Sequence, residues 1–245
     1  MKRPIVVLTS LLVGVTLAAP AFAHEAGQWI VRGGVGTVMP KDDNLSLGTF
    51  DLVDPAVPLD VTVTNGAVQV DDGTSLTLSF TYMFTENWAF DVLAAWPFKH
   101  DVDLEGTLTD NLTKESGPFS LPFGEVEHLP PTFSVQYHFA PDAEFQPFVG
   151  VGVNYTTFLS EDLDSIWPPL TITDFSLDDS FGLALQVGAD WMFSDQWLVN
   201  FDVRWISIES DLSVTIDTFG GPVSGKLGAV KIDPWVFAIN LGYRF

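Results

Sequence analysis

Residues 229–245 alternate between large apolar side chains and small or polar ones. One face carries Trp235, Phe237, Ile239, Leu241, Tyr243 and Phe245, and the other carries Val236, Ala238, Asn240, Gly242 and Arg244. A repeat of two residues is the period of a β-strand, because successive side chains point to opposite faces. A strand between lipid and a barrel lumen needs one continuously apolar face. The pattern therefore predicts a membrane-spanning β-strand here.

Seven further segments share this alternation. They are Gly27 to Val38, Ser75 to Phe84, Trp88 to Lys99, Leu129 to Phe139, Pro147 to Phe158, Ser180 to Phe193, and a segment that starts at Trp197. Bacterial outer-membrane barrels have an even number of antiparallel strands. The chain is therefore predicted to be an all-β protein, an eight-stranded antiparallel transmembrane β-barrel.

The connections between these segments alternate in length. Short connections cover residues 85–87, 140–145 and 194–196, and long ones cover roughly 40–72, 101–127, 160–179 and 209–227. Short turns of such barrels face the periplasm and long loops face outward, so four long extracellular loops are predicted. Aromatic residues flank each short turn, as Phe84 and Trp88 do. Such rings settle at the depth of the lipid headgroups and form a girdle.

Charge is strongly one-sided. The 245 residues include 10 basic and 32 acidic ones, which gives a net charge of −22. Nucleic acid is excluded as a partner, because phosphate binding needs a basic surface. The long connections hold 23 of the acidic residues, while the apolar faces of the strands hold almost none. Acidic loops and apolar strands thus occupy separate zones.

The acidic loops allow two interpretations. One is a solvated surface, and the other is binding of divalent cations that bridge to anionic lipopolysaccharide. No loop carries the spaced calcium-binding pattern, so neither a metal site nor a cofactor is predicted. The chain has no cysteine, which excludes disulfides and thiolate metal sites.

The first 23 residues have the order of a secretory signal. Lys2 and Arg3 precede an apolar run from Ile5 to Leu17, and Ala21-Phe22-Ala23 is a small-x-small cleavage site. We therefore predict a signal peptide over 1–23 and a barrel over 24–245. A retained anchor is the alternative, but the run is shorter than the ~20 residues that a spanning helix needs.

Several stretches together resemble the OmpW family of small outer-membrane barrels, which includes AlkL-type proteins. They are His24-Glu25-Ala26-Gly27, Thr81-Tyr82-Met83, residues 91–100, His128-Leu129-Pro130-Pro131-Thr132, Gln146 to Gly150, Asn154 to Phe158, Trp197 to Asn200, Asp233 to Phe237 and Gly242 to Phe245. The resemblance covers residues 24–245. It implies a bacterial outer-membrane location, a narrow and partly apolar lumen, and passage of small hydrophobic molecules. It also implies an apolar constriction, to which Leu93 corresponds. The loops are longer and more acidic than those of the family, so receptor roles are not carried over.

Charged residues also occupy predicted lumen positions. They are Arg32, Asp91, Asp190, Asp202, Arg204 and Arg244, together with Lys99. The lumen of an eight-stranded barrel is only wide enough for side chains to fill it. Buried charges must pair or be hydrated, so a salt-bridged plug is expected in the middle and the periplasmic half. These residues either satisfy one another alone or also form a barrier to ions.

Apolar residues share the lumen face. Ile30, Met83, Leu93, Met192 and Leu198 point inward, as do Val38 and Val236. They would serve no purpose in a general aqueous pore. We predict that they line an apolar upper pocket, with Leu93, Met83, Met192 and Leu198 along the path of a ligand.

Prolines mark a candidate lateral opening. Pro97 lies nine residues after Trp88, while Pro130 and Pro131 lie nine and eight residues before Phe139 on the neighbouring strand. Proline lacks the N–H that a strand ladder requires, so pairing is expected to weaken at this height. The alternative is that the prolines only end the ladder near the extracellular rim.

Three functional classes remain from the sequence. The first is a channel for small hydrophobic solutes, which it could release laterally into the bilayer. The second is a closed structural or receptor-type barrel. The third, an enzyme, is not favoured because no nucleophile–base pair is indicated: Ser134 and His138 lie about 13 Å apart along one strand. The expected partners are the lipid bilayer, lipopolysaccharide, small hydrophobic solutes and, through Phe245, the barrel-assembly machinery.

Overall fold

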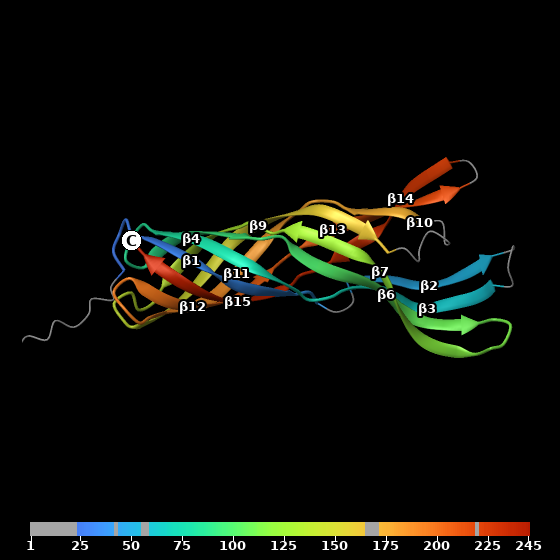
Figure 1. The fold of residues 1–245 in the computed structure, drawn as a ribbon, viewed down its shortest axis with the longest axis horizontal. Coiled ribbons are helices and arrows are strands. Elements are labelled where there is room, and N and C mark those ends of the chain that lie inside the picture. The colour runs from blue at the N-terminus through green and yellow to red at the C-terminus, as the bar shows by residue number, and fades with distance from the viewer. Residues whose placement is uncertain (1–23, 42–43, 55–58, 165–171, 219–220) are drawn as a thin grey trace, which may run out of the picture.

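The computed structural model describes residues 24–41, 44–54, 59–164, 172–218 and 221–245 as one elongated all-β body (Figure 1). The predicted signal peptide, residues 1–23, lies outside the described residues. In the part of the chain that is described, no helix has the length and apolar character needed to cross a bilayer.

Eight antiparallel strands form a closed barrel. They are β1 (Trp29–Met39), β4 (Gly73–Met83), β5 (Trp88–Ala95), β8 (Thr132–His138), β9 (Phe145–Leu163), β11 (Ser180–Met192), β12 (Trp197–Ile206) and β15 (Trp235–Arg244). Each pairs with its neighbour in the order β11-β12-β15-β1-β4-β5-β8-β9, and pairing of β9 with β11 closes the ring. The predicted eight-stranded barrel is therefore confirmed.

The two faces of the barrel wall differ as the alternation requires. On β4, Leu76 is 63% exposed while the adjacent Thr77 is 5% exposed. On β15, Ile239 is 61% exposed and Asn240 is 8% exposed. Large apolar side chains on an outer surface of this extent are stable only against lipid, and the polar side chains fill the interior.

Short connections join the strands at one end, which we call the turn end. There the backbone N–H of Phe84 donates to the carbonyl of Trp88 at 2.9 Å, and that of Phe193 donates to Trp197 at 3.1 Å. Pairs of aromatic rings surround this end; Trp29 contacts Tyr82, and Trp88 contacts Tyr137, each with ring centroids 4.9 Å apart. The aromatic residues thus lie where the predicted girdle requires.

The opposite end, which we call the hairpin end, differs from the prediction. The four long connections contain strands instead of irregular loops: β2 (Leu45–Asp54), β3 (Leu59–Val70), β6 (Phe98–Asp110), β7 (Ser116–Leu129), β10 (Ile172–Leu177), β13 (Glu209–Thr218) and β14 (Gly221–Lys231). These strands escaped detection because their exposed faces are acidic or small and their ladders contain register shifts.

The hairpin end consists of two leaves, visible as separate groups at the right of Figure 1. The larger leaf continues the barrel wall through β9, β7, β6, β3 and β2. The smaller leaf is a separate three-stranded sheet, β10-β13-β14. Apolar side chains of both leaves pack together in one core, which also includes Val38 and Val236 from the barrel wall.

The side-chain alternation shifts by one position after Pro97. Asp91 and Leu93 point into the barrel, but beyond the proline Phe98 and His100 point inward, at 2% and 3% exposure. The sequence had placed Phe98 outside and Lys99 in the lumen. That assignment is wrong, because Lys99 is 61% exposed and pairs with Glu125 at 2.6 Å on the surface. The cause is an extra residue on this strand, described below.

Candidate functional site

Five of the predicted lumen charges form a continuous chain across the middle of the barrel, which we call the charged floor: Arg32, Asp91, Asp190, Asp202 and Arg204. Arg32 lies 2.5 Å from Asp190 and 3.9 Å from Asp91. Arg204 lies 2.9 Å from Asp91 and 2.8 Å from Asp202. All five side chains are at most 7% exposed, so each charge is held by its neighbours and not by water.

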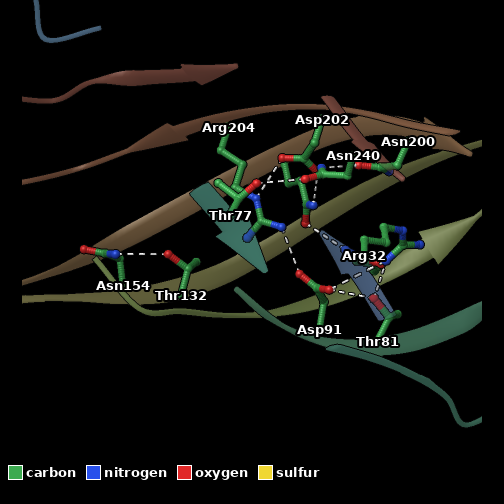
Figure 2. A network of polar contacts seen from close by, with 12 residues as sticks. Arg32, Thr77, Thr81, Asp91, Thr132, Asn154, Asn200, Asp202, Arg204 and Asn240 are labelled. Atoms are coloured by element: carbon green, nitrogen blue, oxygen red, sulfur yellow. Dashed lines mark hydrogen bonds and ion pairs between the residues drawn. The ribbon is translucent and has the colours of Figure 1, made fainter. Parts of the chain in front are cut away.

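Neutral polar side chains satisfy the rest of the floor, as Figure 2 shows. The Thr81 hydroxyl donates to Asp91 Oδ1 at 2.6 Å and accepts from Arg32. Asn200 donates to Asp190 Oδ1 at 2.8 Å, and Gln186 donates to Asp202. Only about 10 Å³ of free space remains between these side chains, room for a single water at most. The described side chains of the floor are thus closely packed around this space.

Arg244 does not join the floor, although the sequence placed it in the same cluster. Its Nε and Nη2 donate to the backbone carbonyl of Asp195, at 3.0 Å and 2.6 Å. Arg244 thus holds the last short turn at the turn end. Its separation follows from strand height, which the alternation of side chains cannot give.

The predicted apolar path is divided into separate parts. Met83, Met192 and Leu198 pack with Ile30 and Ala89 in a fully buried cluster, the apolar plug, beside the short turns. Leu93 instead borders the floor, next to Arg204. Because Asp91 lies on β5 between Ala89 and Leu93, the floor separates the plug from Leu93. The expectation of one continuous ligand path in an upper pocket is therefore wrong for Met83, Met192 and Leu198.

An apolar chamber does lie at the hairpin end. Its walls come from both leaves: Val68, Val70, His100, Val102, Phe123, Val126, His128, Phe158, Phe175, Leu177, Leu212, Val230 and Ile232. About 30 Å³ of space is free between these side chains, so the chamber is nearly closed as it stands. A solute would enter only as side chains of the two leaves move apart.

A histidine pair is the polar element of this chamber. Nε2 of His128 lies 2.9 Å from Nε2 of His100, and the rings stack with centroids 4.9 Å apart. His100 Nδ1 bonds the carbonyl of Asp71 at 2.6 Å, so His100 carries its proton there and accepts through Nε2. Burial lowers the pKa of His128 to about 3, with a smaller effect from His100, and burial also lowers the pKa of His100. Both rings are therefore neutral at pH 7.

The barrel wall is interrupted beside the chamber. Pairing of β5 with β8 stops at Leu93 and Thr132, and pairing of β6 with β7 begins at Phe98 and His128. Residues 94–97 and 129–131, all of them described, form no ladder pair with one another. We call this interruption the ladder gap, and it contains the three predicted prolines, Pro97, Pro130 and Pro131.

Each edge of the ladder gap is held by the strand behind it. The N–H of Trp96 donates to the carbonyl of Leu76 at 2.8 Å, and the N–H of Tyr155 donates to Pro131 at 3.0 Å. Inside the lumen, the Asn154 amide donates to the carbonyls of Pro130 and Pro131, at 3.1 Å and 3.2 Å. The edge of residues 94–97 has four residues, and the facing edge of residues 129–131 has three. This one extra residue shifts the alternation after Pro97.

Comparison with known proteins places this architecture in a family. The model of the OmpW family matches residues 25–245. Outer membrane protein W of Vibrio cholerae serotype O1 is 38% identical over 229 residues, which cover 93% of each chain. The chain belongs to the OmpW family. The crystal structure of the outer membrane protein OprG from Pseudomonas aeruginosa superposes with a TM-score of 0.73 at 34% identity, and the match covers 92% of this chain and 99% of that one.

A more distant relative carries a metabolic name. The dibenzothiophene metabolism operon protein PahQ of Pseudomonas aeruginosa is 26% identical over 230 residues, 94% of this chain and 93% of its own length. Membership in this family makes the protein an outer-membrane barrel of Gram-negative type. By the rule for such barrels, the turn end faces the periplasm and the hairpin end faces outward.

Two functional candidates were not recognised in the sequence. His24 and His138 lie 1% and 0% exposed at the turn end, near Asp190, although the sequence had weighed histidines only as catalytic bases. The alternation on the strand that ends at His138 indicates that His138 faces the lumen. It does not show that residue 24 folds back against that strand. Ser134 and His138 are both buried, and neither donates to the other in the described residues. Contacts with lipopolysaccharide and recognition of Phe245 by the assembly machinery stay predictions.

Proposed function

We propose that this OmpW-family barrel admits small hydrophobic compounds at its extracellular end and releases them sideways into the outer membrane. The ladder gap beside the apolar chamber is the observation that carries the proposal. A barrel wall is normally closed by continuous pairing, so an interruption in it needs an explanation.

The chamber supports the entry step. Its walls are apolar on all sides, apart from two neutral histidines, so it suits an uncharged and hydrophobic solute. The two leaves that enclose it belong to separate sheets, so no ladder joins them. The bonds that would break as they part include the one from the Lys231 N–H to the carbonyl of Asn44, at 2.9 Å. Such a solute gains free energy from burial, at about 25 cal/mol for each Å² of apolar surface.

The charged floor supports lateral rather than straight passage. An apolar solute that moved toward the periplasm would have to displace Arg32, Asp91 and Arg204 from their partners, and removal of one partner from a buried ion pair costs about 3–5 kcal/mol. Below the floor lie the apolar plug and other buried side chains, among them His24 and His138. The ladder gap is the alternative exit above this barrier, and it opens toward lipid.

A variant with a sealed gap tests the exit step. Deletion of Pro97 combined with Pro130→Thr and Pro131→Val removes the extra residue and restores two N–H donors. The pairing of Leu93 with Thr132 would then continue in register to Phe98 and His128. We expect slow amide hydrogen exchange across the seal and a several-fold loss of uptake of an alkane-like probe in a deletion strain.

The control and the opposing result are clear. Pro118→Val changes a proline on β7 outside the gap and should leave uptake unchanged. Unchanged uptake in a variant whose exchange data show a closed ladder would reject lateral release. If the native protein itself gave no more uptake than the deletion strain, the second candidate would be favoured, a closed structural or receptor-type barrel. The small free space at the floor also fits that candidate.

The substrate class follows from the chamber and has support from one relative. The full name of PahQ refers to dibenzothiophene metabolism, and dibenzothiophene is an uncharged aromatic heterocycle. A panel of uncharged alkanes and fused aromatics is therefore the set to assay. An enzyme is not proposed, and a test for lipid hydrolysis by the purified protein would check that position.

A further inference from the structure

Three buried groups meet inside the barrel at the turn end, below one end of the charged floor. The ligand-type atoms of His24, His138 and Asp190 all lie within 4.8 Å of one another. The three residues are 1%, 0% and 0% exposed. They come from separate parts of the chain: the segment before β1, the end of β8, and β11.

The proton positions on His138 are fixed by a relay of amide groups that starts at a carboxylate. Asp202 can only accept, so Gln186 presents its NH₂ group to it and its oxygen to Gln136. The Gln136 NH₂ group donates to that oxygen at 3.1 Å, which leaves Gln136 Oε1 to face His138 Nε2 at 3.2 Å. His138 must therefore donate from Nε2, and its Nδ1 carries a lone pair.

The same arrangement occurs at His24. Its Nδ1 lies 3.3 Å from Gln28 Oε1, so Nδ1 donates and Nε2 carries the lone pair. The two lone-pair nitrogens, His24 Nε2 and His138 Nδ1, are buried and have no hydrogen-bond partner.

Asp190 retains the capacity to bind a further cation. Its Oδ1 accepts from Arg32 Nε at 3.1 Å and from Asn200 at 2.8 Å, while Oδ2, among the residues that the structure describes, accepts only from Arg32 Nη2 at 2.5 Å. A carboxylate has about four lone-pair sites, which leaves one on Oδ2. The charged floor contains three carboxylates and two guanidinium groups, so it also holds one uncompensated negative charge.

Three acceptors that face one another without a donor are unfavourable unless a cation lies between them. We propose that His24, His138 and Asp190 bind a divalent metal ion of the Zn²⁺ class, which fastens the segment before β1 to the barrel wall. Two imidazole nitrogens and one carboxylate oxygen are a common zinc donor set, with water as the fourth ligand. A tetrahedral ion would draw the three atoms to about 3.4 Å apart, given bonds of about 2.1 Å.

The surroundings meet the other requirements of a metal site. Gln28 and Gln136 orient the two imidazoles from behind, as outer partners of metal ligands do. His138 also stacks on Phe148, with ring centroids 4.9 Å apart, which fixes the ring plane. His24 lies outside the barrel strands, and its N–H is tied to the carbonyl of Pro141 at 2.9 Å. The ring of His24 can therefore approach the ion while the wall stays in place.

Metal titration of the protein purified from outer membranes without a polyhistidine tag tests this proposal. After chelation, isothermal titration with Zn²⁺ should show one tight equivalent, and Co²⁺ should give the visible absorption of a tetrahedral site. His138→Phe keeps the aromatic stack on Phe148 and should weaken binding by about 100-fold or more. His128→Phe, in the chamber histidine pair, is the matched control and should bind as the native protein does.

The acidic hairpin end supplies a competing explanation that the same experiment addresses. Binding that survives His138→Phe, or that weakens steeply with salt, would belong to surface carboxylates and would overturn the proposal. Failure of the folded native protein to take up one equivalent would also overturn it. Gln136→Leu is a second variant. It removes the hydrogen-bond partner behind His138 but leaves all three metal ligands in place, and it should weaken Zn²⁺ binding by roughly 10- to 100-fold. A difference in electrophoretic mobility between unheated and boiled samples confirms that each variant is folded.

Discussion

The two halves of this barrel use opposite interiors. The periplasmic half is filled by ion pairs and a small apolar plug, and its free space holds at most one water. The extracellular half is enclosed by apolar side chains of two leaves and bears its charges on the outside. The first interior is held by directional bonds that leave little freedom, whereas the second is held by contacts that tolerate rearrangement. In the proposed function, closure and passage thus belong to different ends of one barrel.

The largest effect is expected from a break in the charged floor. Asp91 is the carboxylate shared by both guanidinium groups, so Asp91→Asn leaves Arg32 and Arg204 short of a partner. We expect a loss of about 3–5 kcal/mol in the free energy of unfolding, measured by urea denaturation in lipid vesicles. A variant as stable as the native protein would show that the floor is hydrated and not closed.

The apolar plug provides the next test of the comparison. Leu198 is fully buried among Ile30, Met83 and Met192. Leu198→Ala should cost about 2–5 kcal/mol of unfolding free energy because it leaves a cavity. Uptake of hydrophobic probes should remain unchanged, since the proposed exit lies above the floor. A parallel loss of uptake and of stability would contradict the division of labour between the two halves.

Acidification should act on the extracellular half. Burial holds the pKa of His128 near 3, whereas an unfolded histidine titrates near 6.5. Between these values the unfolded state binds a proton that the folded state does not, so stability is fully present above pH 6.5 and falls as pH decreases. From pH 6.5 to 4.5 the loss is roughly 2–3 kcal/mol. Hydrogen exchange of β6 and β7 against pH measures it. His128→Phe should reduce the dependence by the share of His128 and leave the part that comes from the other buried histidines, such as His100.

The smallest effect is expected at the surface. Lys99 and Glu125 pair at 2.6 Å with both side chains more than a third exposed. Glu125→Gln should change the unfolding free energy by less than about 1 kcal/mol, and the change should vanish in high salt. A larger effect would mean that the outer face of the larger leaf contributes to the stability of the barrel.

Much of the fold could be read from the chain because lipid imposes a simple rule on outward side chains. The eight strands, the short turns and the inward position of Arg32, Asp91, Asp190, Asp202 and Arg204 all follow from it. The strands of the hairpin end could not be read, because neither of their faces meets lipid and acidic residues mask the alternation.

The heights of side chains along the barrel axis also could not be predicted from the sequence. Alternation shows that Met83, Leu93 and Arg244 face inward, but only the pairing of distant strands fixes their levels. The same limit concealed the approach of His24 to Asp190, residues that are remote in the chain. The extra residue at Pro97 reverses the orientation of Phe98 and Lys99 relative to the prediction. The prediction was wrong there because it continued the alternation unchanged across the proline.

The two leaves at the hairpin end meet along a seam that consists mostly of side chains. No ladder pair joins the two sheets in the described residues, and the Lys231 N–H donates across the seam to the carbonyl of Asn44 at 2.9 Å. Such a seam resembles a protein–protein interface more than the inside of a domain, and its width should respond to whatever apolar molecules surround it. We expect the two leaves to lie farther apart in detergent than in a membrane, which distances measured between them would test. Their separation would then depend on the protein together with its surroundings.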